Sequence, residues 1–145
     1  MSVTAISIAL RAEVRSRANG LCEYCHSSEL VSGHYFEVDH VMPESKGGQI
    51  HLDNLALACR SCNLHKADRV DGRDPNTGQL VKLFNPRLQR WQDHFAWSND
   101  GAQVMPLTPV RRATIVALNM NDLLVVSARA IWVTAGKHPP EKPTF

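Results

Sequence analysis

The sequence predicts a mixed α+β protein with a cysteine-containing module in residues 1–73 and a smaller α+β extension in residues 74–145. Three observations support this class. The cysteines form two C-x-x-C pairs, the segment between the pairs changes from strand-like to helix-like patterns, and the second half has a strand hairpin followed by helical patterns. With 145 residues, 43% of them hydrophobic, the chain can bury a core and does not belong to the disordered class.

The first predicted element is a helix over Thr4–Ala18. Ile6, Leu10 and Val14 recur at a spacing of four residues, and the Asn-Gly pair at 19–20 is a typical helix end. The apolar start lacks a basic flank and a small-residue cleavage site, so we expect no signal peptide and a cytoplasmic protein. No uncharged stretch approaches the ~20 apolar residues of a membrane span, and no membrane partner is expected.

The chain has four cysteines, which are Cys22, Cys25, Cys59 and Cys62. They suit metal binding if both pairs act together. In a secreted protein four cysteines would suggest two disulfides, but a reducing compartment disfavours them. Two C-x-x-C turns offer four thiolates to one tetrahedral ion, which is the donor set of structural zinc. Redox dithiols and unpaired core cysteines are the alternatives. The 33 residues between the pairs exceed the roughly 15–20 of simple zinc ribbons, which points to an insert with a function of its own.

The sequence of the insert and of the second cysteine pair predicts a strand, a loop, a second strand and a helix, in that order. Residues Tyr35–Val41 alternate and are rich in aromatic and β-branched types, which indicates a strand. A loop containing proline and a Gly-Gly pair follows. The apolar segment Asn54–Cys59 predicts a second strand, and the second cysteine pair opens a helix through about Arg69. A metal ion at the cysteines would therefore join both ends of the insert.

In chain order, these residues read CEYC, EVDHVMPESKGG and NLALACRSCNLHK. In this order and spacing the chain resembles the HNH endonuclease family in its four-cysteine form, from about Arg11 to Lys66. The resemblance implies a zinc-stapled ββα-metal module. It also implies hydrolysis of phosphodiester bonds in DNA that leaves a 5′ phosphate and a 3′ hydroxyl.

The resemblance assigns roles to four residues. Asp39 matches the metal-binding aspartate, and His40 matches the general base. Asn54 matches the central asparagine, which braces the loop that carries the histidine. Asn63 replaces the final histidine of the family name and would be the second ligand of the catalytic ion.

The chemistry of these residue types suits that reaction. Phosphodiester hydrolysis needs an activated water and stabilisation of charge on the phosphoryl oxygens. Histidine titrates near neutral pH, so His40 can accept a proton from water. Asp39 and Asn63 offer the oxygen ligands that Mg²⁺ or Mn²⁺ prefers. Lys66 lies three residues after Asn63, on the same helix face, and with Arg60 is expected to contact phosphate.

The extension is expected to begin with strands over Leu80–Phe84 and Trp91–Trp97. Residues 98–101 read as a hairpin turn into a further strand over Ala102–Met105. The aromatic side chains of the second strand share one face by alternation. That face is interpreted as core rather than as a platform for stacking bases.

Two helices are expected to follow. Thr108 reads as the N-cap of the first, with Pro109 at its first position. Asn121 reads as the N-cap of the second, which is expected to run to about Ala135.

The charge distribution bears on partners. Residues 1–73 carry 8 basic and 9 acidic residues, whereas residues 74–145 carry 8 and 5, a net charge of +3. DNA binding by the module is therefore expected to be local and metal-dependent, with the extension and its Arg111-Arg112 pair as a second hold on DNA. A homodimer, or docking into a larger nuclease assembly, is the other reading of the extension. The alternative function is a zinc-dependent nucleic-acid-binding module without catalysis.

Overall fold

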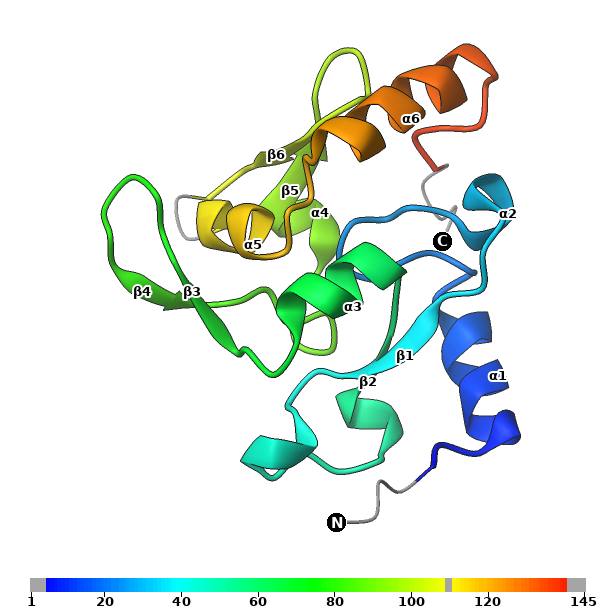
Figure 1. Cartoon of the computed structure of the whole chain (residues 1–145), viewed down its shortest axis with the longest axis vertical. Helices are drawn as coiled ribbons and strands as arrows, with labels where there is room; N and C mark the ends of the chain where they lie inside the picture. Colours follow the sequence, from blue (N-terminus) through cyan, green and yellow to red (C-terminus); the bar gives the residue numbers. More distant parts are fainter. Residues whose placement is uncertain (1–4, 109–110, 141–145) are drawn as a thin grey trace.

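The computed structural model describes residues 5–108 and 111–140. In these residues the chain forms three separate two-stranded antiparallel sheets with short helices between and around them (Figure 1). The mixed α+β class is confirmed. The described elements are α1 Ile8–Arg17, α2 Glu29–Ser32, β1 Glu37–His40, η1 Glu44–Lys46, η2 Leu52–Asn54, β2 Leu55–Ala58, α3 Arg60–Lys66, β3 Asp71–Arg73, β4 Leu80–Lys82, α4 Trp91–His94, β5 Phe95–Trp97, β6 Val104–Pro106, α5 Arg111–Ala117 and α6 Leu123–Thr134.

The β1–β2 hairpin is the centre of the first module. Its strands pair in register with Asp39 opposite Ala56 and His40 opposite Leu55. All four residues of β2 are buried, so this strand is a core strand, and the two 3-10 turns η1 and η2 lie in the loop between the strands. Both expected strands are present, each shortened by one or two residues at either end because the hairpin pairing stops there.

Helices α1 and α3 pack against this hairpin, from different parts of the chain (Figure 1). The described start of α1 is Ile8, because the Ser7 side chain accepts a hydrogen bond from the Leu10 amide at 3.1 Å and caps the helix; residue 4 of the expected helix lies outside the described residues. The third helix ends at Lys66, earlier than expected, because Ala67 adopts a positive φ of 49°.

The extension begins within a hairpin. Strand β3 pairs with β4, so the expected boundary between residues 73 and 74 falls in the turn of one hairpin. Helix α5 packs on β3 at Gly72, where an added Cβ would lie 3.3 Å from the Ala117 side chain. The shared hairpin means that the extension continues the module without a linker.

The expected strand over residues 91–97 is wrong in its first half. Trp91–His94 forms one turn of helix, and only Phe95–Trp97 is extended and pairs with β6. The apolar residues Trp91 and Phe95 are four apart, a spacing that also fits a helix. The indole Nε1 of Trp91 donates to the Tyr24 carbonyl at 2.9 Å, and this tertiary contact fixes the turn.

The last helix is present but its cap differs from expectation. Asp122, not Asn121, caps α6, and its carboxylate accepts from the Leu124 amide at 3.1 Å. The Asn121 side chain instead pairs with both backbone groups of Val104, each at 2.8 Å. The local pattern was therefore overridden by a contact with β6. The expected cap at Thr108 involves residues 109–110, which lie outside the described residues.

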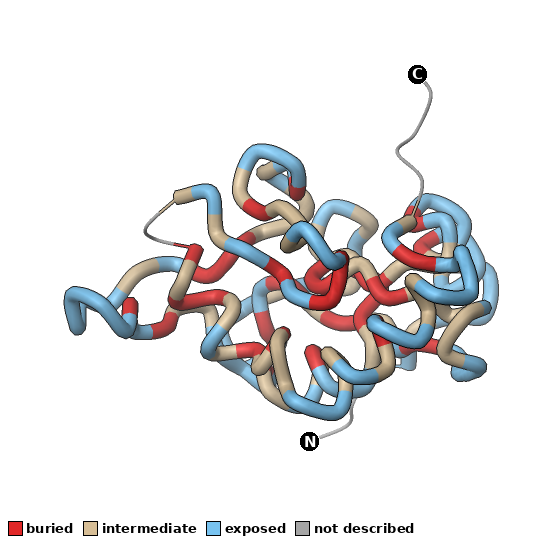
Figure 2. Tube along the Cα trace, turned by 90° about the horizontal axis from the view of Figure 1, so that it is seen from above, coloured by how far each residue is buried: buried red, intermediate tan, exposed pale blue. Residues whose placement is uncertain are grey.

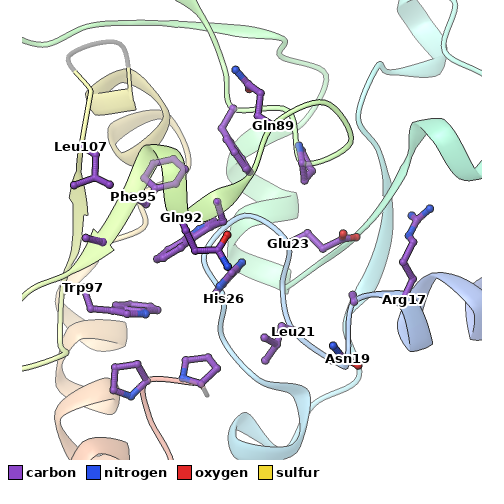
Figure 3. Close-up of a pocket in the computed structure, with 17 residues that line it drawn as sticks. Arg17, Asn19, Leu21, Glu23, His26, Gln89, Gln92, Phe95, Trp97 and Leu107 are labelled. Atoms are coloured by element: carbon purple, nitrogen blue, oxygen red, sulfur yellow. The ribbon is translucent and has the colours of Figure 1, made fainter. Parts of the chain in front are cut away.

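One core runs from the first module into the extension, and Figure 2 shows its buried segments along the centre of the trace. Phe95 and Trp91 are 1% and 7% exposed, which confirms that the aromatic stripe is core. A groove of about 1070 Å³ remains where the two parts meet, lined by His26 on one side and Trp97 on the other (Figure 3). Within the described residues no helix is long and apolar enough to cross a membrane.

Candidate active site and metal centre

The two C-x-x-C turns come together. The sulfur atoms of Cys22, Cys25, Cys59 and Cys62 all lie within 4.8 Å of one another. The Cys25 and Cys59 sulfurs are 3.7 Å apart, close to the roughly 3.8 Å edge of a tetrahedron with zinc–sulfur bonds of about 2.3 Å. The predicted four-cysteine cluster is confirmed, and its donor set and spacing fit a structural zinc ion.

Two of these sulfur atoms accept hydrogen bonds from backbone amides, which stabilise negative charge on the sulfur. The Cys25 amide donates to the Cys22 sulfur, and the Cys62 amide to the Cys59 sulfur, both at 3.4 Å. Burial raises the pKa of the Cys22 thiol, whereas the hydrogen bond with Cys22 lowers the pKa of Cys25. Four thiols this close cannot all ionise by themselves, so the arrangement favours a bound metal ion that stabilises the thiolates.

Asp39 lies at the end of β1 and is 7% exposed. Its Oδ2 accepts from the Tyr24 hydroxyl at 2.8 Å and lies 3.1 Å from the Lys66 ammonium. Burial raises the pKa of Asp39, and the positive charge of Lys66 acts in the opposite direction. Both neighbours bind the same oxygen, and among the described residues none hydrogen-bonds to Oδ1. The carboxylate is therefore held rigidly while one oxygen stays available.

His40 is the last residue of β1, where the strand ends and the loop begins. Its Nε2 is one of four buried side-chain polar atoms that lack a hydrogen bond within the described residues. Glu44 Oε1 lies 3.5 Å from it. Buried polar atoms in native proteins are nearly always hydrogen-bonded, so this nitrogen needs an explanation, for which a bound water or a catalytic role is suited.

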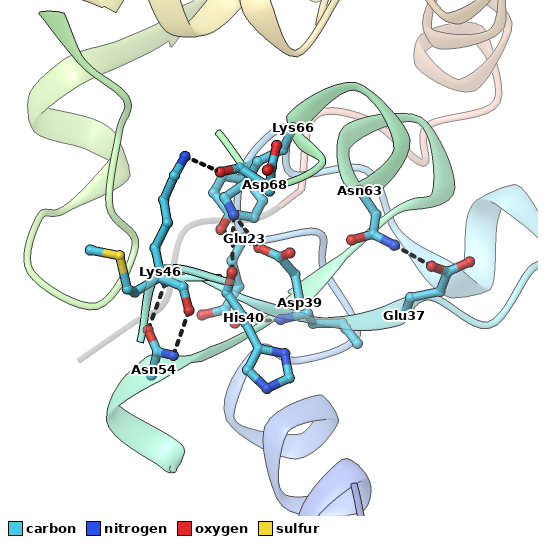
Figure 4. Close-up of polar contacts among 12 residues, drawn as sticks. Glu23, Glu37, Asp39, His40, Lys46, Asn54, Asn63, Lys66 and Asp68 are labelled. Atoms are coloured by element: carbon cyan, nitrogen blue, oxygen red, sulfur yellow. Dashed lines mark hydrogen bonds and ion pairs between the residues drawn. The ribbon is translucent and has the colours of Figure 1, made fainter. Parts of the chain in front are cut away.

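Asn54 braces the loop that follows His40. Its Nδ2 donates to the carbonyls of Met42 and Gln49, at 3.0 and 3.1 Å, and its Oδ1 accepts from the Met42 amide at 2.8 Å. One side chain thus closes both ends of the loop (Figure 4). The family role of Asn54 stays a prediction, and these contacts support it.

The brace leaves no room for a side chain at Gly48. A Cβ there would lie 1.7 Å from the Met42 carbonyl oxygen and 2.9 Å from Asn54 Nδ2. We expect Gly48→Ala to lower the free energy of unfolding by about 3 kcal/mol, because backbone has to move. Gly47→Ala is the control, since nothing lies within 4 Å and only its φ of 89° is strained, which costs about 1 kcal/mol. Chemical denaturation measures both, and equal losses would contradict the steric argument.

Asn63 lies on α3 and faces β1 (Figure 4). Its Nδ2 donates to the Glu37 carboxylate, which is two residues before Asp39 on the same strand. Because alternate residues of a strand share a face, Glu37, Asp39 and the Asn63 amide gather on one side of the hairpin. Asn63 therefore presents its Oδ1 away from the Glu37 contact.

Lys66 does not fit the phosphate contact expected for it. Its side chain is 2% exposed, and its ammonium pairs with Asp39 and donates to the His40 carbonyl at 3.0 Å. Burial of an ammonium group is costly unless an opposite charge lies beside it, and the Asp39 carboxylate is that partner. Arg60 is exposed at the start of α3, and its expected contact with phosphate stays a prediction.

The Arg111-Arg112 pair is also not free to bind DNA as expected. Arg111 is 6% exposed and its Nε donates to His94 Nδ1 at 3.0 Å, whereas Arg112 pairs with Asp74 at 2.7 Å. These two positive charges of the extension are therefore bound to groups of the protein itself.

Sequence reasoning missed three side chains of this site. Glu37 was detectable, because alternation places it on the face of Asp39. Tyr24 lies between two cysteines, and no local signal links it to Asp39. Lys46, in the turn after His40, is exposed and donates to the Asp68 carbonyl at 2.6 Å. It is a cation beside the loop that only the fold places there.

Comparison with known families gives one match: the sequence model of the HNH endonuclease family matches residues 22–69. The matched segment begins at the first cysteine and ends just after α3, so it contains both C-x-x-C turns and the β1–β2 hairpin. Comparisons with curated proteins and with solved structures found no match.

Proposed function

We propose, from the match of residues 22–69 to the sequence model of the HNH endonuclease family, that the protein is a metal-dependent DNA endonuclease. In this proposal His40 is the general base, and Asp39 and Asn63 are ligands of one catalytic Mg²⁺ or Mn²⁺. The family implies a nucleic acid substrate. The observation that carries the proposal is the unsatisfied Nε2 of His40 at the end of a strand whose preceding residue is a rigidly held carboxylate.

The donor set fits a hard divalent ion. The free Oδ1 of Asp39 and the Oδ1 of Asn63 are oxygen ligands, and an ion bound by two protein ligands keeps water and phosphate in its other positions. When bound, such an ion supplies positive charge to the phosphoryl oxygens and to the leaving oxygen. Lys66 and Tyr24 act by holding Asp39 through Oδ2, and they contribute no contact to the substrate.

His40 performs the proton transfer in this proposal. Its Nε2 accepts a proton from the attacking water, and the Asn54 brace keeps the backbone after His40 in place during that step. Glu44 Oε1 lies 3.5 Å from this nitrogen, on the side where the imidazolium would form. The exposed cations Arg60 and Lys46 are then the candidates for holding the DNA backbone.

The test of the function is cleavage of a supercoiled plasmid by the zinc-loaded protein, with Mg²⁺ or Mn²⁺ added and without any chelator. We expect nicked or linear product with either ion and none in their absence. Folded, zinc-loaded protein that binds DNA in a salt-dependent manner but never cuts it would contradict catalysis and support the nucleic-acid-binding alternative.

A sharper prediction concerns Glu37, which holds the Asn63 amide. Glu37→Ala frees that amide, so we expect the Mg²⁺ concentration for half-maximal cleavage to rise about 10-fold. Glu37→Gln retains an acceptor and should stay nearer to the wild type. If both variants lose cleavage equally at saturating Mg²⁺, Glu37 is not acting by orienting Asn63.

A further inference from the structure

Arg129 is a charged residue in an apolar setting. It lies on α6 and is 0% exposed, although several of its neighbours on the helix are exposed. Its two terminal nitrogens donate to neutral oxygens: the carbonyls of Ala102 and Met120, at 3.0 and 2.6 Å, and Asn121 Oδ1 at 3.2 Å. The guanidinium also lies over the Trp97 ring, 5.4 Å from its centroid. All these partners are uncharged.

Arg129 therefore lacks a counter-charge among the carboxylates of the described residues. None of the ion pairs found in residues 5–108 and 111–140 includes it. Its Nε is, like His40 Nε2, one of the four buried side-chain atoms without a hydrogen bond there. A buried cation without a counter-charge is strongly destabilising, so the fold must supply a negative group in another form.

The four-cysteine cluster is that negative group. The Trp97 ring that covers Arg129 lies 5.3 Å from the ring of Trp91, and Trp91 stacks on His26, the residue after Cys25. Burial lowers the pKa of Arg129, and the charges of Cys25, Cys62 and Cys59 act in the opposite direction. A doubly charged zinc ion with four thiolates leaves two negative charges uncompensated. The free Nε and this excess negative charge are complementary.

We propose that Arg129 is the counter-ion of the zinc centre, that its Nε donates to the Cys25 thiolate, and that metal binding and docking of the extension are therefore coupled. This role does not depend on catalysis. It assigns the extension a task in this chain: α6 brings a positive charge to a metal site whose four ligands all belong to the first module.

Further contacts at the same junction support the coupling. His26, next to Cys25, stacks on Trp91 with ring centroids 4.2 Å apart. His138 is 7% exposed and packs edge-on against Trp97, whose ring also covers Arg129. Aromatic residues of the extension thus pack against the residue next to Cys25, and the groove in Figure 3 is lined by His26, Trp91 and Trp97.

The experiment compares zinc affinities by competition with a chromophoric chelator. We expect Arg129→Met to bind zinc about 10- to 100-fold more weakly than the wild type, the effect typical of groups that support metal ligands, and Arg129→Lys to lie between them. Arg112→Met is the matched control, because its partner is Asp74 and its loss should leave zinc affinity unchanged. A folded Arg129→Met that binds zinc as tightly as the wild type would overturn the proposal.

A second measurement uses the wild type and does not depend on folding of a variant. In protein loaded with NMR-active cadmium in place of zinc, a hydrogen bond from Arg129 Nε to the Cys25 sulfur should give a scalar coupling between the metal and the Nε proton. A well-resolved Nε–H signal without that coupling would overturn the assigned hydrogen bond. Neither measurement involves DNA cleavage.

Discussion

Replacement of His40 by alanine is expected to lower plasmid cleavage by about 100-fold or more, because a general base contributes a factor of that size or larger. Zinc content and melting temperature should stay near those of the wild type, since His40 is not a zinc ligand and its Nε2 makes no hydrogen bond that the fold would lose. Initial rates of nicking at saturating Mg²⁺ measure the effect.

His34→Ala is the matched control for this variant. His34 is exposed and lies before β1, outside the braced loop, so its removal should leave cleavage unchanged. Cleavage by folded His40→Ala at the wild-type rate would refute the role of His40 as base.

Loss of the metal centre is expected to have the largest effect on stability. Zinc binding to structural sites is worth roughly 10–16 kcal/mol in small zinc domains, which matches or exceeds the whole stability of a typical domain. Cys59→Ser, or removal of zinc by a chelator, should therefore unfold the first module. Cys59 also caps α3 through the Cys62 amide, so this helix loses its start as well.

The tryptophans report whether the extension unfolds with the module. Trp91, Trp97 and Trp132 all belong to the extension, and Trp91 is bound to the carbonyl of Tyr24, between two cysteines. Chelation should change their fluorescence in the same transition that removes the helical circular dichroism signal. Cys59→Ser that retained zinc and melted at the wild-type temperature would contradict a structural four-thiolate site.

The elements of the first module were predictable because their signals are local. Two C-x-x-C turns, an alternating strand and a Gly-Gly loop each depend on residues a few positions apart, and each is found where it was expected. Predictions failed where a distant partner decided the outcome. Trp91 is held in a helical turn by Tyr24, and Asn121 is drawn from its expected cap to Val104.

The same distinction between local signals and distant contacts applies to the residues of the candidate site. The sequence pattern singled out Asp39, His40 and Asn54 as candidates, and in the structure the Asn54 side chain hydrogen-bonds to both backbone groups of Met42. The pattern also placed Lys66 on the face of Asn63, but helix periodicity cannot say whether that face meets solvent or a buried carboxylate. The fold places Lys66 against Asp39, so its charge pairs with that carboxylate inside the protein.

The sequence by itself determined the ligand set, the order of the elements and the family resemblance, since these depend on residue types and short spacings. Tertiary structure alone decided which charged side chains are buried or paired inside the protein. Glu37 and Asn63 meet across 26 residues of chain, and Arg129 of the last helix is buried against backbone carbonyls of distant residues. Such contacts are set by how separate elements pack, because burial of a charge is tolerated only where another element supplies its partner.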